Sequence, residues 1–359
     1  MASLPLAPGA ALGVLGGGQL GRMLALAAAR LGFDTVVLEP EPDSPAARVA
    51  AHAIVAAYDD EAALAELAAR VQVVTYEFEN VPAAAVDRLR ALGVEVAPGP
   101  RALAVAQDRF EEKSFLNAAG VATVAFAAAD SPEGAVAAVT QIGAPALMKT
   151  RREGYDGKGQ RWVEHAADAA AVFQALGGAP VIVEAPAAFA RELSVIAARG
   201  RDGAIAVYPL AENHHADGVL RRSLAPAPVS AATAAQAERI AIRILTGLDY
   251  VGVIGVELFE LADGSLLVNE FAPRVHNTGH WTQDGCVVDQ FEQHIRAVAG
   301  WPLGPTTAVH GVEMINLLGH EADDWGRYAI EPDSRLHLYG KRDAKPGRKM
   351  GHVNRLRPL

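Results

Sequence analysis

Short apolar runs alternate with segments of helical periodicity over the first hundred residues, and this alternation constrains the fold more than any other feature. The runs ALGVLG, DTVVLEP, AHAIVAAY and QVVTYEF have the length and composition of buried strands. Between them, RMLALAAARLG and DDEAALAELAARV carry apolar residues at helical spacing. Such alternation predicts a parallel sheet with helices on both faces. We therefore place a Rossmann-like, doubly wound α/β domain at residues 1–104.

The rest of the chain is predicted to form further packed units, because 359 residues exceed what one small core accommodates. A second region spans 105–300 and includes a small α+β subdomain at about 121–184. The apolar strands of HGVEMINLLG and RLHLYGK predict a third, C-terminal mixed domain at 301–359. No internal repeat and no low-complexity linker interrupts this order.

Several local patterns set the elements of the second region. Residues 101–120 read as one helical stretch that ends at Gly120. Two pairs of alternating strands turn at Asp202-Gly203 and at Asp263-Gly264. The segment KTRREGYDGKGQ joins two predicted strands and combines three glycines with several cationic side chains, a composition that suits a loop around phosphate better than a core segment.

Composition excludes several classes of protein. A formal net charge of -10 argues against general affinity for nucleic acid or an anionic membrane, so an anionic ligand needs a local cluster of cations. The single cysteine, Cys286, excludes an internal disulfide and a cysteine-rich zinc site. No apolar run is long enough to cross a bilayer, and the N-terminus lacks the basic start of a signal peptide. These features predict a cytoplasmic protein.

A glycine motif near the N-terminus is open to several interpretations. Gly16, Gly18 and Gly21 satisfy G-x-G-x-x-G between a predicted strand and helix, and Glu39 ends the next strand. This context is that of a dinucleotide-binding turn, which by itself would indicate an NAD(P)-dependent dehydrogenase. The same glycines would also suit a plain tight turn or a helix start that holds another phosphate.

Acidic residues on a later strand pair favour ATP over a nicotinamide. Glu257 lies on one predicted strand, and Asn269 and Glu270 end its partner, so antiparallel pairing can place the two carboxylates side by side. Two carboxylates and an amide oxygen suit Mg²⁺ bound with nucleotide phosphates. A solvated strand face is the plainer alternative, but apolar residues flank both acids. The glycine loop does not match the Walker A pattern.

The next loop, FAPRVHNTGHWTQDG, carries polar groups suited to a substrate. It concentrates Arg274, His276, Asn277, His280 and Gln283 with little aliphatic content. A surface loop rarely gathers these residue types directly after a metal-binding strand. We therefore interpret it as a substrate loop.

Six motifs in this order resemble the ATP-grasp superfamily and, within it, the N5-carboxyaminoimidazole ribonucleotide synthetase family. They are GGGQLGRM, TYEFENV, QDR, GYDGKGQ, NEFAPRVHNTGHWT and GRKMGHVN, and they extend over nearly the whole chain. The resemblance implies an ATP-grasp fold and an ATP-dependent carbon–nitrogen ligase of purine (IMP) biosynthesis. Bicarbonate would be phosphorylated to carboxyphosphate, and 5-aminoimidazole ribonucleotide would then be carboxylated, with release of ADP and phosphate. It also implies Mg²⁺ as cofactor and a homodimer.

The resemblance assigns roles to individual residues. Arg109 and Lys149 would hold the ATP phosphates, Glu192 the ribose, and His215 would lie near the nucleotide. Glu257 and Glu270 would bind Mg²⁺, with Asn269 beside them. The loop that covers the phosphates would consist of Gly154, Tyr155, Asp156, Gly157, Lys158, Gly159 and Gln160. The strand that meets adenine would consist of Glu184, Ala185, Pro186 and Ala187. Since Pro186 has no N–H, the donor to adenine would be Ala187 or a neighbour.

The remaining roles concern bicarbonate and the ribonucleotide. Tyr155, Arg274 and His276 would line the bicarbonate and carboxyphosphate pocket. Lys341 and Arg348, helped by Gln19, would bind the phosphate of 5-aminoimidazole ribonucleotide. Either Glu77 or Glu79 would receive the aminoimidazole.

Plainer roles and other functions remain open alternatives. His215 would otherwise only cap a loop, and Lys341 would be a surface lysine. Another ATP-grasp ligase would keep the ATP site but lack RVHNTGHW and GRKMGH. A dehydrogenase would leave the acid pair unused, and intact metal ligands argue against a non-catalytic nucleotide-binding module.

Overall fold

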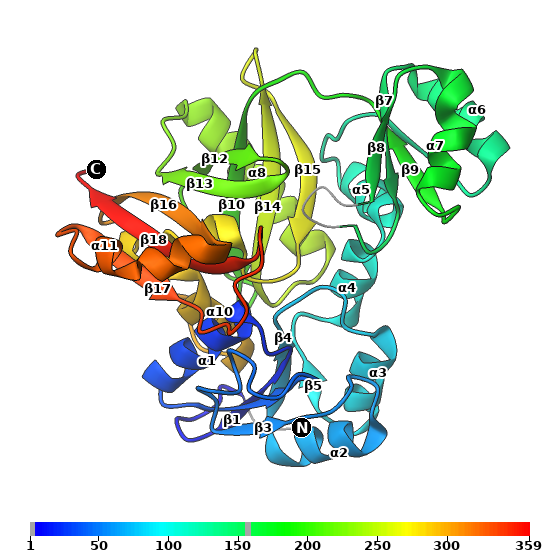
Figure 1. Cartoon of the computed structure of the whole chain (residues 1–359). Coiled ribbons are helices and arrows are strands. Elements are labelled where there is room, and N and C mark those ends of the chain that lie inside the picture. Colours follow the sequence, from blue (N-terminus) through cyan, green and yellow to red (C-terminus); the bar gives the residue numbers. More distant parts are fainter. Residues whose placement is uncertain (1–3, 155–158) are drawn as a thin grey trace.

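The computed structural model describes residues 4–154 and 159–359, which form three sheets with helices packed against them (Figure 1). The N-terminal sheet is parallel, in the order β3-β2-β1-β4-β5, which confirms the α/β alternation read from the sequence. Its strands are β1 (Ala11–Leu15), β2 (Asp34–Leu38), β3 (His52–Ile54), β4 (Val73–Tyr76) and β5 (Glu95–Val96). Its helices are α1 (Gln19–Arg30), α2 (Glu61–Arg70) and α3 (Ala83–Ala91).

The stretch after this sheet is two helices, so the prediction of one continuous helix over 101–120 is wrong. Helix α4 (Pro100–Ala106) ends before Asp108, and α5 (Arg109–Ala118) begins directly after it. The Asp108 carboxylate accepts the N–H groups of Phe110 and Glu111, so it caps a new helix. As a result, the first turn of α5 points into the region between the sheets.

The small subdomain is an antiparallel sheet in the order β6-β9-β7-β8, with two helices against it (Figure 1). Helices α6 and α7 supply much of its separate apolar core, which includes Val139 and Phe173. Its elements are β6 (Phe126–Ala129), α6 (Pro132–Ile142), β7 (Ala146–Thr150), β8 (Gln160–Val163), η1 (Ala166–Asp168), α7 (Ala169–Ala175) and β9 (Val181–Glu184).

The central sheet has nine strands, and the C-terminal strands extend it instead of forming a sheet of their own. The order is β15-β14-β10-β12-β13-β16-β18-β17, with β11 beside β10. The strands are β10 (Phe189–Arg199), β11 (Ile205–Val207), β12 (Ala211–Ala216), β13 (Val219–Ala225), β14 (Gly252–Leu261), β15 (Leu266–Ala272), β16 (Gly311–Leu318), β17 (Ser334–Leu338) and β18 (Lys349–Arg357). Among the described residues, no helix is long and apolar enough to span a membrane.

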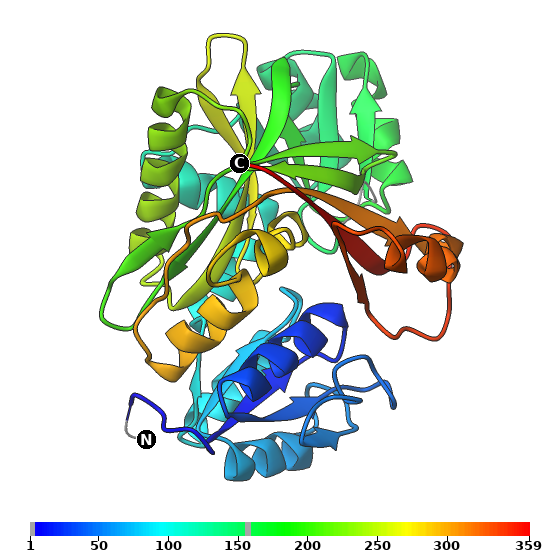
Figure 2. The ribbon, with the colours of Figure 1, turned by 90° about the vertical axis from the view of Figure 1, so that its left-hand side faces the viewer.

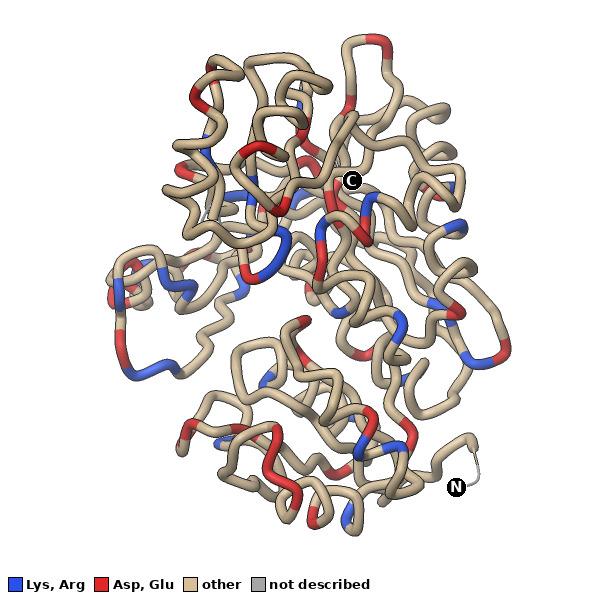
Figure 3. Tube along the Cα trace, turned by 90° about the vertical axis from the view of Figure 1, so that its right-hand side faces the viewer, with Lys and Arg blue, Asp and Glu red and all other residues tan. Residues whose placement is uncertain are grey.

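Helices on the central sheet join the parts of the molecule. Helix α8 covers one apolar cluster of the sheet, and α10 belongs to a second cluster that also contains residues of α1. Figure 2 shows α1 of the N-terminal unit beside α10. The helical elements here are α8 (Ala231–Gly247), η2 (Asn277–Gly279), α9 (Thr282–Gly285), α10 (Gln290–Ala299), η3 (Gly319–Asp324) and α11 (Trp325–Ala329). Charges of both signs are spread over the whole trace (Figure 3).

Candidate active site

One cavity of about 450 Å³ lies where the three sheets meet. Its wall includes Gln19 and Glu79 from the N-terminal unit, Lys149 from the small subdomain, and Glu257 and Glu270 from the central sheet. The cavity therefore collects side chains that are far apart in the sequence, and many of them are among those predicted to bind ATP, metal or substrate.

The two acids predicted to bind metal face each other. Strands β14 and β15 pair Glu257 directly with Glu270. Burial and the neighbouring Glu270 raise the pKa of Glu257 to about 7. Desolvation acts in the same direction on Glu270, but the Arg109 ion pair outweighs it and holds the pKa of Glu270 at about 2. Two close carboxylates, of which only Glu270 is paired with Arg109, form a site that a further cation would stabilise.

Two cations lie next to these acids. Arg109 donates to the Glu270 carboxylate at 2.7 Å and to the Gly154 carbonyl at 2.9 Å. Lys149 pairs with the buried Glu184 carboxylate at 2.7 Å, and Lys113 approaches the same carboxylate at 3.4 Å. The sequence did not single out Lys113, because nothing local to α5 indicates that its partners lie on β9 and β15.

Helix α5 contributes a third acid that the sequence missed. Glu112 lines the cavity, and its carboxylate accepts the N–H of Phe271 at 2.6 Å. Burial and the nearby Glu270 raise the pKa of Glu112 to about 8.

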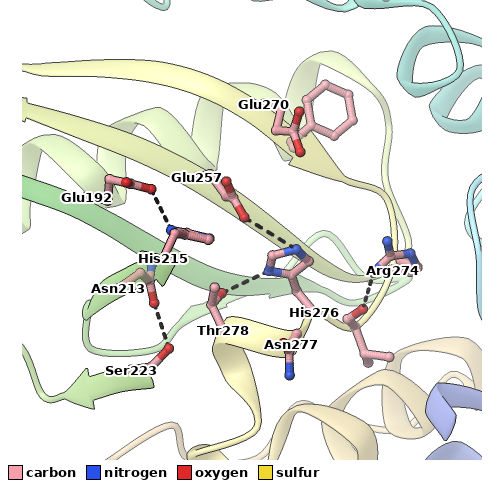
Figure 4. Close-up of polar contacts among 12 residues, drawn as sticks. Glu192, Asn213, His215, Ser223, Glu257, Glu270, Arg274, His276, Asn277 and Thr278 are labelled. Carbon is pink, nitrogen blue, oxygen red and sulfur yellow. Dashed lines mark hydrogen bonds and ion pairs between the residues drawn. The ribbon is translucent and has the colours of Figure 1, made fainter. Parts of the chain in front are cut away.

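The loop after β15 turns two of its predicted substrate residues into the cavity. Arg274 pairs with Glu79 of the N-terminal unit, and His276 lies with Nε2 3.7 Å from the Glu257 carboxylate (Figure 4). The other ring nitrogen, Nδ1, lies 2.9 Å from the Thr278 hydroxyl. Burial and the Arg274 cation lower the pKa of His276 to about 3, so its imidazole is neutral.

The other predicted substrate residues of this loop make structural contacts, and of these Asn277 also reaches the cavity wall. Asn277 lines the cavity and exchanges amide hydrogen bonds with Asn316. His280 is buried against Phe291 and His352, where Gln290 bonds to its Nδ1. Neither His280 nor Gln283 is among the described residues that line the cavity.

A second histidine–acid pair lies on the central sheet. His215 on β12 contacts the Glu192 carboxylate on β10 at 2.8 Å, and both line the cavity (Figure 4). Burial lowers the pKa of His215, but the Glu192 carboxylate outweighs this effect and raises it overall. The sequence had left a plain loop-capping role open for His215, whereas its partner is a carboxylate in the cavity wall.

The N-terminal glycine turn binds carboxylates of the protein itself. Glu77 accepts the N–H groups of Gly18 and Gly21 at 2.5 and 2.7 Å, and Glu39 accepts that of Gly17 at 2.7 Å. A Cβ at Gly21 would lie 2.8 Å from the Gly16 carbonyl oxygen, a backbone atom, which explains the need for glycine there. The N–H groups that would bind a dinucleotide pyrophosphate are thus engaged, which argues against the dehydrogenase alternative. Of the two glutamates left open by the sequence, Glu79 lines the cavity and Glu77 holds the turn.

The residues predicted for the substrate phosphate lie beside this turn. The Lys341 ammonium is 5.8 Å from the centre of the Tyr339 ring, and Arg348 donates to the Asp343 carbonyl. Burial and the nearby Arg348 lower the pKa of Lys341 to about 8. Neither residue is among those that line the cavity, whereas Lys349, which the sequence missed, is.

The predicted adenine strand is partly engaged elsewhere. Glu184 pairs with both Phe126 and Leu147 in its sheet, and Ala185 donates its N–H to the Ala125 carbonyl at 2.9 Å. None of the four residues 184–187 is among the described residues that line the cavity. With Pro186 unable to donate, Ala187 is left as the candidate donor in this segment.

The covering loop is described only at its ends. Gly154 and Gln160 line the cavity, and the Gly159 carbonyl accepts the N–H of Thr150 at 2.8 Å. Four residues predicted to contact ATP lie outside the described part of the chain: Tyr155, Asp156, Gly157 and Lys158.

Three family models together match most of the chain. They are described as the ATP-grasp domain, over residues 114–291, the ribonucleotide synthetase preATP-grasp domain, over 10–107, and the phosphoribosylaminoimidazole carboxylase C-terminal domain, over 313–358. An N5-carboxyaminoimidazole ribonucleotide synthase of Brucella melitensis is 51% identical over 355 residues, covering 98% of each chain. The Pseudomonas aeruginosa protein of the same name is 46% identical, covering 95% of this chain and 93% of its own.

Solved structures agree with these matches. The N5-carboxyaminoimidazole ribonucleotide synthetase of Thermus thermophilus superposes with a TM-score of 0.91 at 45% identity, covering 97% of this chain and 94% of its own. The Aspergillus clavatus synthase, in complex with ADP and 5-aminoimidazole ribonucleotide, gives a TM-score of 0.91 at 32% identity, covering 98% and 95%.

Proposed function

Because the chain belongs to the N5-carboxyaminoimidazole ribonucleotide synthetase family of ATP-grasp enzymes, we propose that it carboxylates 5-aminoimidazole ribonucleotide with bicarbonate and ATP. The reaction is a step of purine biosynthesis and yields ADP, phosphate and N5-carboxyaminoimidazole ribonucleotide. The observation that carries the proposal is one cavity that joins the Glu257/Glu270 pair to Lys149 on one side and to Arg274 and His276 on the other. A nucleotide and a small oxyanion can therefore meet within it.

The donor set fits Mg²⁺. Glu257, Glu270 and Asn269 offer hard oxygen ligands, and Mg²⁺ commonly uses one or two carboxylates together with substrate phosphates. The described residues contain no group of three or more His, Cys, Asp or Glu side chains that could hold a metal alone, so the phosphates would complete the coordination. When held by Glu257, Asn269 and Glu270, Mg²⁺ would neutralise charge on the transferred phosphoryl group.

In the first step, a bicarbonate oxygen attacks the γ-phosphorus of ATP. The new P–O bond forms carboxyphosphate while the bond from the γ-phosphorus to the β,γ-bridging oxygen breaks and ADP leaves. We propose that Arg109 and Lys149 stabilise charge on the phosphates. Their electrostatic effect is strong because the cavity limits screening by water. Tyr155 is proposed to line the same pocket from the covering loop.

Arg274 is proposed to orient bicarbonate and then carboxyphosphate. Its guanidinium forms the planar fork that matches a carboxylate, and the Glu79 ion pair fixes its direction. The neutral imidazole of His276 lies beside it and can accept a hydrogen bond without repelling Mg²⁺.

In the second step, the exocyclic amine attacks the carboxyl carbon of carboxyphosphate. A C–N bond forms, the C–O bond to phosphate breaks, and the departing phosphate takes the proton that the nitrogen loses. We propose Glu79 as the acid that receives the aminoimidazole, since it lies in the cavity wall and Glu77 is committed to the glycine turn. Gln19, Lys341 and Arg348 would hold the substrate phosphate.

The remaining assignments complete the nucleotide site. Glu192 would bind the ribose, His215 would stabilise Glu192, and Ala187 would meet adenine. We also propose the domain limits 1–104, 105–300 and 301–359. We further propose that the protein forms a homodimer, which sedimentation analysis tests. One assay tests the function as a whole. ADP release in bicarbonate buffer should depend strongly on 5-aminoimidazole ribonucleotide. If no ADP is released when that substrate is present, the proposal is contradicted.

The nucleotide preference gives a direct binding prediction. Mg-ATP should raise the melting temperature by a few degrees, because a ligand at about 100 times its Kd stabilises the native state by about 2.7 kcal/mol. NADH and NADPH should leave it unchanged, since carboxylates of the protein occupy the glycine turn. Thermal denaturation with each nucleotide is the measurement. A shift with NADH and none with Mg-ATP would favour the dehydrogenase.

The lowered pKa of Lys341 predicts that turnover of the ribonucleotide depends on pH. This pKa means that the ammonium loses its charge above about pH 8, so kcat/KM for the ribonucleotide should fall by up to about tenfold per pH unit beyond that point. Lys341→Arg should remove this fall, because a guanidinium stays protonated. The profiles of both proteins are measured between about pH 7 and 9. Identical profiles would exclude Lys341 as the group that titrates.

A further inference from the structure

Strand β15 contains a bulge at the proposed metal site. Glu257 lies opposite Glu270, but the next residue, Leu258, lies opposite Val268, so Asn269 is an extra residue without a partner in the ladder. In a regular strand, adjacent side chains point to opposite faces. Residues 269–272 all line the cavity, and a bulge allows the side chains of Asn269 and Glu270 to turn toward the same face of the sheet.

Helix α5 binds the backbone on both sides of Glu270. Lys113 donates to the Asn269 carbonyl at 2.9 Å, and Glu112 accepts the N–H of Phe271 at 2.6 Å. Glu112 is 3% exposed and Lys113 is 1% exposed, so neither bond competes with bulk water. A disrupted ladder leaves backbone groups in need of partners, and these two side chains supply them.

The same helical turn also reaches the carboxylate. Arg109 precedes Glu112 by three residues, which places both on one face of α5, and it donates to Glu270 at 2.7 Å. One turn further along, the Phe115 ring packs edge-on against the Phe271 ring. The first turns of α5 therefore hold the side chain of Glu270 and the backbone before and after it.

We propose that Glu112 and Lys113 are positioning residues that lock the β15 bulge, so that Asn269 and Glu270 both present oxygens to the divalent cation of the bound nucleotide. They act through the backbone of β15 and do not touch the metal themselves. This inference rests on the proposed function, since it presumes that Glu270 is a metal ligand. It predicts that loss of the Glu112 acceptor weakens metal binding without removing any ligand.

The test compares substitutions that separate the hydrogen bond from the carboxyl group. Glu112→Met fills the same volume without an acceptor for the Phe271 N–H. Glu112→Gln keeps an acceptor oxygen and replaces the carboxyl group by an amide. The matched control is Glu111→Gln, the same chemical change on the adjacent residue of α5, whose side chain is 57% exposed and is not among those that line the cavity.

The measurement is the affinity of Mn²⁺ for the protein in the presence of ADP, read by electron paramagnetic resonance. Glu112→Met should weaken binding by about 10- to 100-fold, as is typical when a partner that orients a metal ligand is lost. Glu112→Gln should stay within about threefold of wild type on the same grounds. In turnover assays, Glu112→Met should raise the Mg²⁺ concentration needed for half-maximal rate more than it changes KM for the ribonucleotide.

The outcomes separate the two levels of the proposal. If wild type does not bind Mn²⁺ with ADP, the proposed function fails. If wild type binds and Glu112→Met binds equally well, or if Glu112→Gln is as weak as Glu112→Met, the positioning role is overturned. Should Glu112→Met fail to fold, Glu112→Asp replaces it, because a side chain one methylene shorter keeps the carboxyl group but cannot reach the Phe271 N–H.

Discussion

Glu270→Gln is expected to lower turnover by about 10³-fold, or about 4 kcal/mol of transition-state stabilisation, while the protein stays folded. Gln has the size of Glu but no charge, so a divalent cation would no longer be held against the nucleotide phosphates. The melting temperature should change little, since the Glu270 side chain is 39% exposed in the cavity wall. Its loss also relieves the repulsion that raises the pKa of Glu257.

The measurement is the rate of ADP release with saturating 5-aminoimidazole ribonucleotide, together with thermal denaturation of the same sample. Glu238→Gln, an exposed position on α8, is the control for the charge change and should turn over like wild type. If Glu270→Gln is as active as wild type at the same Mg²⁺ concentration, Glu270 is not a metal ligand. The inference about Glu112 would then lose its premise.

The parallel N-terminal sheet could be predicted because its pattern is local. Buried parallel strands read as apolar runs, and the helices between them show their own period. The break between α4 and α5 was missed because both helices have compatible spacing, and only the Asp108 side chain marks the start of the second helix. The hairpin of β12 and β13 was also missed, since its sequence AENHHA…VLRRSLA is too polar to read as buried strands.

The candidate site could be predicted only in part, for a different reason. The acid pair follows from two neighbouring strands and a tight turn, which set the register of Glu257 and Glu270. In contrast, Glu77 accepts hydrogen bonds from residues that are 56 and 59 positions away along the chain. The partner of Glu112 is 159 positions away. No local period encodes such contacts, so the choice between Glu77 and Glu79 needed the fold.

Lys149→Met is expected to reduce kcat/KM for ATP by about 10²- to 10³-fold, because it removes a fixed cation from the phosphate end of the cavity. The variant should still fold. Lys149 pairs with the buried Glu184, and an unpaired buried carboxylate would be costly, but Lys113 lies 3.4 Å from the same carboxylate and remains its partner.

Lys149→Arg is the matched variant, since it keeps the charge and changes the shape of the donor. It should retain more activity than Lys149→Met if charge on the phosphates is what matters, although its planar fork will not reproduce the ammonium geometry. Steady-state kinetics with ATP varied, and thermal denaturation of all three proteins, distinguish the effects. If Lys149→Met kept wild-type kcat/KM with an unchanged melting temperature, Lys149 would serve only to neutralise Glu184, and the phosphates would have to be bound by Arg109 and by the loop between β7 and β8.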